Sequence, residues 1–242
     1  MNQIPKPHLS IIIPVYNEEK RVNNLTRIIS YLKKQKFKWE VIVVNDGSTD
    51  KTMKKLKILK NRLRFKILSY YPNIGKGFAI KTGMLSTTGK YRLFLDIDLS
   101  TPVDELNRFL PFLKKFDIVI GSRKMKSSEV IVKQSLLREF LGKTFTYISQ
   151  KILQMNVSDF TCGFKCFNSK AAEIIFAKQT IKRWGFDSEI LYIGKLKKFS
   201  IKEVPVIWKN DPGTKVRFPQ DIINSLVELI TIRLNSLQNL YR

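Results

Sequence analysis

The first half of the chain alternates continuous apolar runs with segments whose apolar residues recur at helical spacing. Runs such as Leu9–Ile13 and Glu40–Val44 are typical of strands buried on both faces. Arg21–Lys36 carries its apolar residues three or four apart, which predicts an amphipathic helix. Further helices are expected at Thr52–Lys60, Gly77–Ser86 and Val103–Lys114, and further strands at Phe65–Leu68, Tyr91–Leu95 and Ile118–Ile120. This order predicts an α/β fold with a mostly parallel sheet and helices on both faces.

The second half has a different pattern. Val130–Met155 is long, amphipathic and basic, Phe199–Trp208 resembles a strand, and Asp221–Arg242 has its apolar residues on one side of a helix. No run reaches the roughly 18 apolar residues that span a bilayer, and no signal peptide is recognisable. We therefore expect one α/β domain over residues 1–220, which includes an amphipathic segment at 129–155, followed by an amphipathic helix at 221–242.

The charge balance is strongly basic, with 44 Lys and Arg against 20 Asp and Glu, giving a formal net charge of +24. Such an excess favours an anionic partner: nucleic acid, anionic lipid or a phosphorylated substrate. The alternative is a solvated, lysine-rich surface, because the lysines are spread along the whole chain. Cys162 and Cys166 are the two cysteines and His8 is the single histidine. Since structural zinc needs four ligands, we expect small buried thiols in a reducing compartment.

The residues that follow the predicted strands carry the candidate chemistry, because ligands of open parallel sheets bind beyond the carboxyl ends of the strands. Asp96 and Asp98 close the fourth strand, and two carboxylates at this spacing can bind Mg²⁺ or Mn²⁺. Asp46 follows the second strand and can bind a nucleobase or ribose, or can serve as a turn residue. The glycine-rich run Asn73–Gly77 fits neither a P-loop nor a dinucleotide fingerprint, which argues against an ATPase or a dehydrogenase.

These motifs together resemble the inverting glycosyltransferase family 2, whose members have the GT-A fold. The residues that carry the resemblance are Ser10–Glu18 (SIIIPVYNE), Val43–Asp50 (VVNDGSTD), Asp96–Asp98 (DID), Gly121–Arg123 (GSR), Asp159–Lys165 (DFTCGFK), Gly185–Leu191 (GFDSEIL) and Glu203–Lys215. Within the family, the runs NIGKGFAIKTGM, DIDLSTP and GSR are most similar to the polyprenyl-phosphate sugar transferases, in particular the dolichyl-phosphate β-glucosyltransferase group. Ile97 stands where a small residue is usual.

The resemblance implies a role for each matching residue. The nucleotide-sugar donor would be bound by Pro14, Tyr16, Glu18, Asp46, Lys76, Asp96 and Ile97. The metal, Mg²⁺ or Mn²⁺, would be held by Asp96 and Asp98, and the catalytic set would be Asp98, Arg123 and Asp159. The acceptor phosphate would meet Arg123, Arg138 and Lys215, and the sugar side would be lined by Asp159 with Asp187 or Glu189.

Physical chemistry makes a phosphate acceptor plausible. A phosphate monoester has its second pKa near ~6, so at neutral pH it is largely dianionic and needs no strong base. Arginine suits its recognition because the guanidinium presents forked donors. A hydroxyl acceptor would need a carboxylate base, which Asp187 or Glu189 could supply.

The expected activity is therefore hexose transfer with inversion, preferably of glucose from UDP-glucose, to a polyprenyl or dolichyl phosphate. The enzyme would act peripherally at the cytosolic face of a membrane. The first alternative is a family relative that glycosylates a hydroxyl of a polysaccharide or glycolipid. A basic nucleic-acid-binding protein is the second alternative, disfavoured because the basic residues are not gathered in a recognition element. The oligomeric state is left open.

Overall fold

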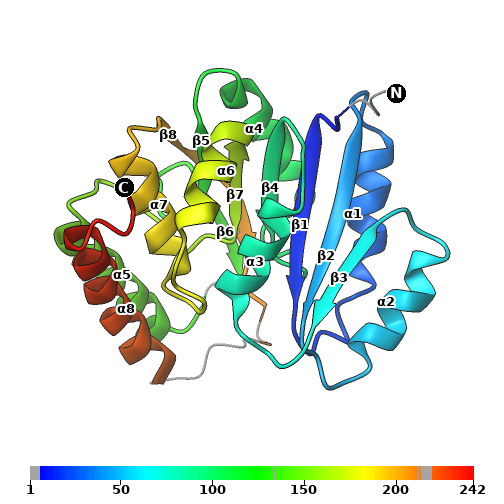
Figure 1. The fold of residues 1–242 in the computed structure, drawn as a ribbon. Coiled ribbons are helices and arrows are strands. Elements are labelled where there is room, and N and C mark those ends of the chain that lie inside the picture. The colour runs from blue at the N-terminus through cyan, green and yellow to red at the C-terminus, as the bar shows by residue number, and fades with distance from the viewer. Residues whose placement is uncertain (1–5, 133, 212, 214–219) are drawn as a thin grey trace.

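The computed structural model describes residues 6–132, 134–211, 213 and 220–242, which are built around a seven-stranded sheet in the order β3-β2-β1-β4-β7-β5-β8 (Figure 1). Its strands are β1 (Leu9–Val15), β2 (Trp39–Asp46), β3 (Lys66–Tyr70), β4 (Tyr91–Leu95), β5 (Ile118–Ser122), β7 (Phe164–Asn168) and β8 (Ile201–Pro205). Only β7 runs antiparallel to its neighbours in this sheet, β4 and β5. The predicted α/β fold with a mostly parallel sheet is confirmed.

Helices cover both faces of the sheet. One face is covered by α1 (Asn24–Lys33), α2 (Thr52–Lys60), the short 3₁₀ helix η1 (Val103–Glu105) and α4 (Leu106–Leu113). The other face is covered by α3 (Lys76–Leu85), α6 (Ser169–Lys178) and α7 (Phe186–Leu196), which lie in front in Figure 1. Two 18-residue helices, α5 (Leu136–Leu153) and α8 (Gln220–Leu237), pack against each other, and α8 also contacts α7.

The strand β1 shows why the apolar runs are continuous. Ile11 and Ile13 pack toward α1, in the cluster that holds Leu25, whereas Ile12 packs on the opposite face with Ile80 of α3. All five side chains have no solvent exposure. Both faces of the strand are covered, so every position of the run is apolar.

The structure of the second half corrects three predictions of secondary structure. Val130–Met155 is not one helix, because Glu129–Val132 forms the strand β6, which pairs with β9 (Ile207–Lys209) in a small second sheet before α5 begins. The β-branched residues of this run favour a strand. Phe199–Trp208 is likewise divided, since β8 and β9 belong to different sheets. The final helix, predicted to continue to residue 242, ends at Leu237.

In the described part of the chain, no helix combines the length and the apolar character needed to cross a bilayer.

Candidate active site

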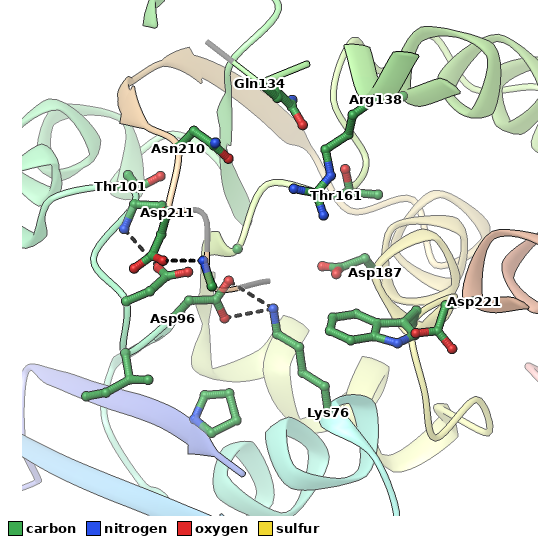
Figure 2. A pocket seen from close by; sticks show the side chains of 18 of the residues that line it. Lys76, Asp96, Thr101, Gln134, Arg138, Thr161, Asp187, Asn210, Asp211 and Asp221 are labelled. Carbon is green, nitrogen blue, oxygen red and sulfur yellow. Dashed lines mark hydrogen bonds and ion pairs between the residues drawn. The ribbon is translucent and has the colours of Figure 1, made fainter. Parts of the chain in front are cut away.

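A cleft of about 1240 Å³ opens beyond the carboxyl ends of β1, β2 and β4 (Figure 2). Most residues assigned to the site from the sequence line it, namely Pro14, Tyr16, Glu18, Asp46, Lys76, Asp96, Ile97, Asp98, Arg123, Arg138 and Asp187. Two of the assigned residues, Asp159 and Glu189, are fully buried and do not line it. Lys215 lies outside the described residues.

The acidic pair and a lysine meet on the floor of this cleft. The Nζ of Lys76 lies 2.7 Å from Oδ1 and 2.9 Å from Oδ2 of Asp96. Burial disfavours the ammonium, but the carboxylates of Asp96 and Asp187 outweigh it and raise the pKa of Lys76. Burial, together with the negative charge of Asp96, raises the pKa of Asp98, one oxygen of which accepts the backbone N–H of Ser100 at 2.8 Å. A cation near Asp96 and Asp98 would relieve this repulsion.

The backbone behind Asp96 fixes its position. A Cβ placed on Gly163 would overlap the Oδ2 of Asp96 and would lie 2.7 Å from its Cγ. Asp96 nevertheless keeps 34% of its side chain exposed to the cleft. Among the described residues, no group of three or more His, Cys, Asp and Glu side chains could hold a metal ion. The chain thus offers two carboxylates, with oxygen ligands of the type that Mg²⁺ and Mn²⁺ prefer.

Asp46 shapes the loop that presents Lys76. It is 2% exposed, and its carboxylate accepts hydrogen bonds from Nδ2 of Asn73 at 2.7 Å and from the backbone N–H groups of Ile74 at 2.9 Å and Gly75 at 3.0 Å. Both carboxylate oxygens are therefore engaged by the protein. The predicted contact of Asp46 with the nucleoside stays a prediction, and the structure adds an organising role.

The glycines on either side of Lys76 allow a close approach of two segments. A Cβ on Gly75, whose φ is +135°, would lie 2.5 Å from the carbonyl oxygen of Lys182. A Cβ on Gly77 would lie 2.7 Å from the Cβ of Phe186. The glycine-rich run therefore serves the packing of α3 against residues 181–186, which the sequence pattern alone could not distinguish from a phosphate-binding loop.

Arg123 and Asp159 form a forked ion pair under one wall of the cleft. The Nε and Nη2 of Arg123 donate to the two oxygens of Asp159 at 2.7 and 2.8 Å, and the backbone N–H of Arg123 donates at 3.0 Å. Although burial opposes ionisation, the guanidinium holds the pKa of Asp159 well below its usual range. The structure differs here from the expectation that Asp159 faces the sugar, because its carboxylate is buried behind Arg123.

The acids of α7 have different surroundings. Asp187 lines the cleft and pairs with the fully buried Lys165, whose Nζ also donates to the carbonyl of Cys162 at 2.7 Å. Burial raises the pKa of Asp187, although Lys165 opposes the shift. Glu189 faces the other way, toward Tyr241, whose hydroxyl it accepts at 2.7 Å. Its expected place beside the sugar is therefore corrected, because α7 turns this carboxylate into the core.

Arg138 enters the cleft from α5. Figure 2 shows its guanidinium directed into the cavity, on the side opposite Lys76 and Asp96. The side chain is half-buried. The cleft therefore has an acidic pair at one side and a cation from the amphipathic helix at the other.

The pair formed by Arg21 and Asp211 was not found from the sequence, whereas Trp184 was expected in the wall of the pocket. Arg21 binds Asp211 through Nε at 3.0 Å and Nη2 at 2.5 Å, and its Nη1 donates to Glu18 at 2.9 Å. The ring of Trp184 lies 5.7 Å from the Nζ of Lys76 and lines the cleft. Arg21 fell within a predicted helix and its partner lies 190 positions away, so no local signal marked it.

The strand β6 and the helices α5 and α8 expose eleven large apolar side chains. Those of β6 and α5 are Ile131, Val132, Leu136, Leu137, Phe140 and Tyr147, and those of α8 are Ile223, Val227, Ile230, Leu234 and Leu237. Leu136 is 85% exposed and Leu237 is 73% exposed. Apolar side chains gathered in this way mark interaction surfaces. We refer to this set as the α5–α8 apolar surface.

Comparison with known proteins gives the family. The sequence model described as glycosyl transferase family 2 matches residues 10–176. The chain is 34% identical to a dolichyl-phosphate beta-glucosyltransferase of Saccharomyces cerevisiae, over 97% of this chain and 76% of that protein. It is 33% identical to the human protein of the same name, over 98% and 78%.

A solved structure supports the fold. Glucosyl-3-phosphoglycerate synthase from Mycobacterium tuberculosis, in complex with Mn²⁺, UDP-glucose and glycerol 3-phosphate, superimposes with a TM-score of 0.66 at 18% identity, over 95% of this chain and 79% of that one. At this identity the likeness concerns the fold, which is GT-A. Sequence match and fold agree, and the chain belongs to glycosyltransferase family 2.

Proposed function

We propose that the protein transfers glucose from UDP-glucose to dolichyl phosphate or a related polyprenyl phosphate, with inversion at the anomeric carbon. The observation that carries the proposal is the position of Arg138, on the amphipathic helix α5 and directed into the cleft opposite Asp96 and Lys76. The relatives named dolichyl-phosphate beta-glucosyltransferase, aligned over nearly the whole chain, support glucose as the transferred sugar and dolichyl phosphate as the acceptor.

The donor would lie over β1, β2 and β4, where Pro14, Tyr16, Glu18, Asp46 and Ile97 line the cleft. We assign the diphosphate to Lys76, Asp96 and Asp98, with Mg²⁺ or Mn²⁺ held by the two carboxylates. Two protein carboxylates and substrate phosphates are a usual ligand set for such ions. When bound, the cation would neutralise the charge that develops on the departing diphosphate. Lys76 adds a second positive charge at this place.

The acceptor phosphate would meet the cations on the opposite side of the cleft. Arg138 and the remaining donors of Arg123 are our candidates, and Lys215 is a further one. Asp159 then acts as a positioning residue, since it holds Arg123 by two side-chain hydrogen bonds. A phosphate oxygen attacks the anomeric carbon, the bond from that carbon to the UDP oxygen breaks, and UDP leaves.

This reaction needs no carboxylate base, because the acceptor is largely dianionic at neutral pH. In the pairing of Asp187 with Lys165, the ammonium occupies one carboxylate oxygen, which fits a reaction without a base, although burial raises the pKa of Asp187. A family 2 enzyme that glycosylates a sugar hydroxyl is the second candidate. It is favoured by the fact that Asp187 still lines the cleft.

We also propose peripheral attachment to the cytosolic face of a membrane, through the α5–α8 apolar surface. In this arrangement the domain at residues 1–220 carries the catalytic cleft, its segment 129–155 faces the lipid, and the helix at 221–242 adds a second apolar contact. The net charge of +24 supports attraction to anionic lipid, where each nearby Lys or Arg contributes about 1 kcal/mol.

A transfer assay with two donors and two acceptors tests the proposal. The wild-type protein is incubated with Mn²⁺ and either UDP-glucose or GDP-mannose, and with either a short polyprenyl phosphate or a free polyprenol of the same length. Product from UDP-glucose and the phosphate alone is expected. Product from the free polyprenol would show transfer to a hydroxyl and would favour the second candidate instead.

A further inference from the structure

The turn that follows α8 contacts the helix α7 in the core of the protein. Tyr241 is 2% exposed, and its hydroxyl donates to the carboxylate of Glu189 at 2.7 Å. Burial and the charge of Glu189 raise the pKa of Tyr241 well above its usual value. The hydroxyl therefore stays protonated and donates at neutral pH. It satisfies one hydrogen-bond acceptor site of a carboxylate that has no access to water.

Glu189 connects Tyr241 to the loop at 179–182. The oxygen that accepts the Tyr241 hydroxyl also accepts the backbone N–H of Thr180 at 2.9 Å and its hydroxyl at 2.5 Å. The other oxygen accepts the N–H of Ile181 at 2.9 Å. From α8, the Nδ2 of Asn235 donates to the Thr180 hydroxyl at 3.0 Å. The loop at 179–182 is thus held by one buried carboxylate, to which Tyr241 also donates.

The same loop supports the first turn of α3. The carbonyl of Lys182 accepts the N–H of Phe78 at 3.0 Å, and Nε2 of Gln179 donates to the carbonyl of Gly77 at 2.9 Å. Lys76 is the first residue of α3. A displacement of the loop would therefore move the backbone that presents the Lys76 ammonium to Asp96.

A second contact from α8 acts on the following residues. The carboxylate of Glu228 accepts the backbone N–H of Gly185 at 2.6 Å. Gly185 adjoins Trp184, whose ring lies 5.7 Å from the Nζ of Lys76. Two acidic side chains, Glu189 on α7 and Glu228 on α8, therefore hold the backbone of the segment 180–185.

We propose that Tyr241 and Glu189 are positioning residues for the donor site, which hold the loop at 179–182 so that Lys76 stays beside Asp96. The ligand whose binding depends on them is a nucleoside diphosphate. The inference rests on the proposed function, since it takes Lys76 and Asp96 as the place of the diphosphate. It makes α8 and the turn after it a part of the donor-binding unit.

The test compares Tyr241→Phe with Tyr192→Phe. Tyr192 on α7 is also 2% exposed, and its hydroxyl accepts from Arg233 at 2.8 Å and bonds Ser236 at 3.2 Å. Each variant loses one hydroxyl near the contact between α7 and α8, but only Tyr241→Phe removes a hydrogen bond to the carboxylate of Glu189. UDP binding in the presence of Mn²⁺ is measured by calorimetry, together with KM for UDP-glucose and kcat.

Tyr241→Phe is expected to weaken UDP binding by up to about fivefold, because the loss of about 1 kcal/mol of loop stabilisation lowers the fraction of protein in the binding-competent conformation. KM for the donor should rise equally while kcat changes little, and Tyr192→Phe should bind UDP as the wild type does. If Tyr241→Phe does not fold, Asn235→Ala is used in its place, and its UDP binding is expected to be about twofold weaker than that of the wild type.

Unchanged UDP affinity in the folded Tyr241→Phe protein, or in Asn235→Ala when that variant is used, would overturn the positioning role alone. Equal weakening in Tyr192→Phe would also overturn it, because the effect would then belong to the contact between the helices. Failure of the wild-type protein to bind UDP would contradict the proposed function and the positioning role together.

Discussion

Replacing Gly163 with alanine should disable the donor site without unfolding the protein. Gly163 lies directly behind Asp96, and the new methyl group would overlap the Oδ2 of that carboxylate. The displaced group is the end of a side chain that is 34% exposed, so Asp96 can turn toward solvent and the core can stay closed. The perturbation therefore acts on one candidate metal ligand and on the partner of Lys76.

The size of the effect follows from the geometry. The methyl carbon would lie 2.7 Å from the Cγ of Asp96, whereas ordinary contacts of this kind are 3.4–4 Å. The carboxylate must therefore move by about 1 Å, and a misplacement of that size can cost about 10²-fold in rate. We expect kcat/KM for transfer to fall about 100-fold, which corresponds to about 2.7 kcal/mol of transition-state stabilisation.

The assay is transfer of glucose from UDP-glucose at increasing Mn²⁺, combined with thermal unfolding. Gly142→Ala is the matched control, since a Cβ there has no heavy atom within 4 Å, and alanine stabilises a helix by about 1 kcal/mol over glycine. The control should keep its donor binding and metal dependence. Wild-type rate and wild-type Mn²⁺ dependence in Gly163→Ala would refute the assignment of Asp96 to the donor site.

Three further predictions concern the metal, the acceptor and the membrane. Asp98→Asn should abolish nearly all transfer and leave the melting temperature close to that of the wild type. Excess EDTA should likewise abolish transfer by the wild-type protein. Full activity in EDTA would exclude the metal role. Arg138→Ala should raise KM for polyprenyl phosphate by a factor that corresponds to about 1.5–3 kcal/mol, and UDP binding should stay unchanged. Arg138→Lys should restore part of the activity. Unaltered acceptor kinetics in Arg138→Ala would show that the acceptor phosphate binds elsewhere. Leu137→Asp combined with Phe140→Asp, at positions 61% and 66% exposed, should reduce flotation with anionic vesicles but not UDP binding; equal flotation of this variant and the wild type would count against the α5–α8 apolar surface.

The elements that the sequence predicted well are those whose pattern is local. The bounds of α2, Thr52–Lys60, and of β4, Tyr91–Leu95, agree with the structure to the residue. In β4 all five residues are buried, so the apolar run and the strand coincide. The acidic pair after β4 was placed at the rim for the same reason, since a strand that ends there must leave the following residues at the edge of the sheet.

The strand β7 escaped detection because its pattern contains a lysine. Lys165 has no solvent exposure and is paired with Asp187, which is 22 positions away in the sequence. A buried lysine is acceptable only where such a partner exists, and the partner cannot be inferred from the strand itself. For the same reason the antiparallel place of β7, between β4 and β5, was not predicted.

The orientation of the two acidic side chains on α7 could not be predicted from the sequence either. Nine consecutive residues from Phe186 to Gly194 are buried, so the helix has no exposed face from which to orient Asp187 and Glu189. The choice between them depends on Lys165 and Tyr241, which come from distant segments. Family resemblance named both acids, and only the packing of the chain separates the one in the cleft from the one in the core.

The most direct test of the account is the identity of the product formed from UDP-glucose and a short polyprenyl phosphate. Mass spectrometry and proton NMR of the lipid fraction should show one glucose joined to the phosphate in the β configuration, formed only with Mg²⁺ or Mn²⁺ present. Glucose joined to a hydroxyl, or retention of the α configuration, would contradict it.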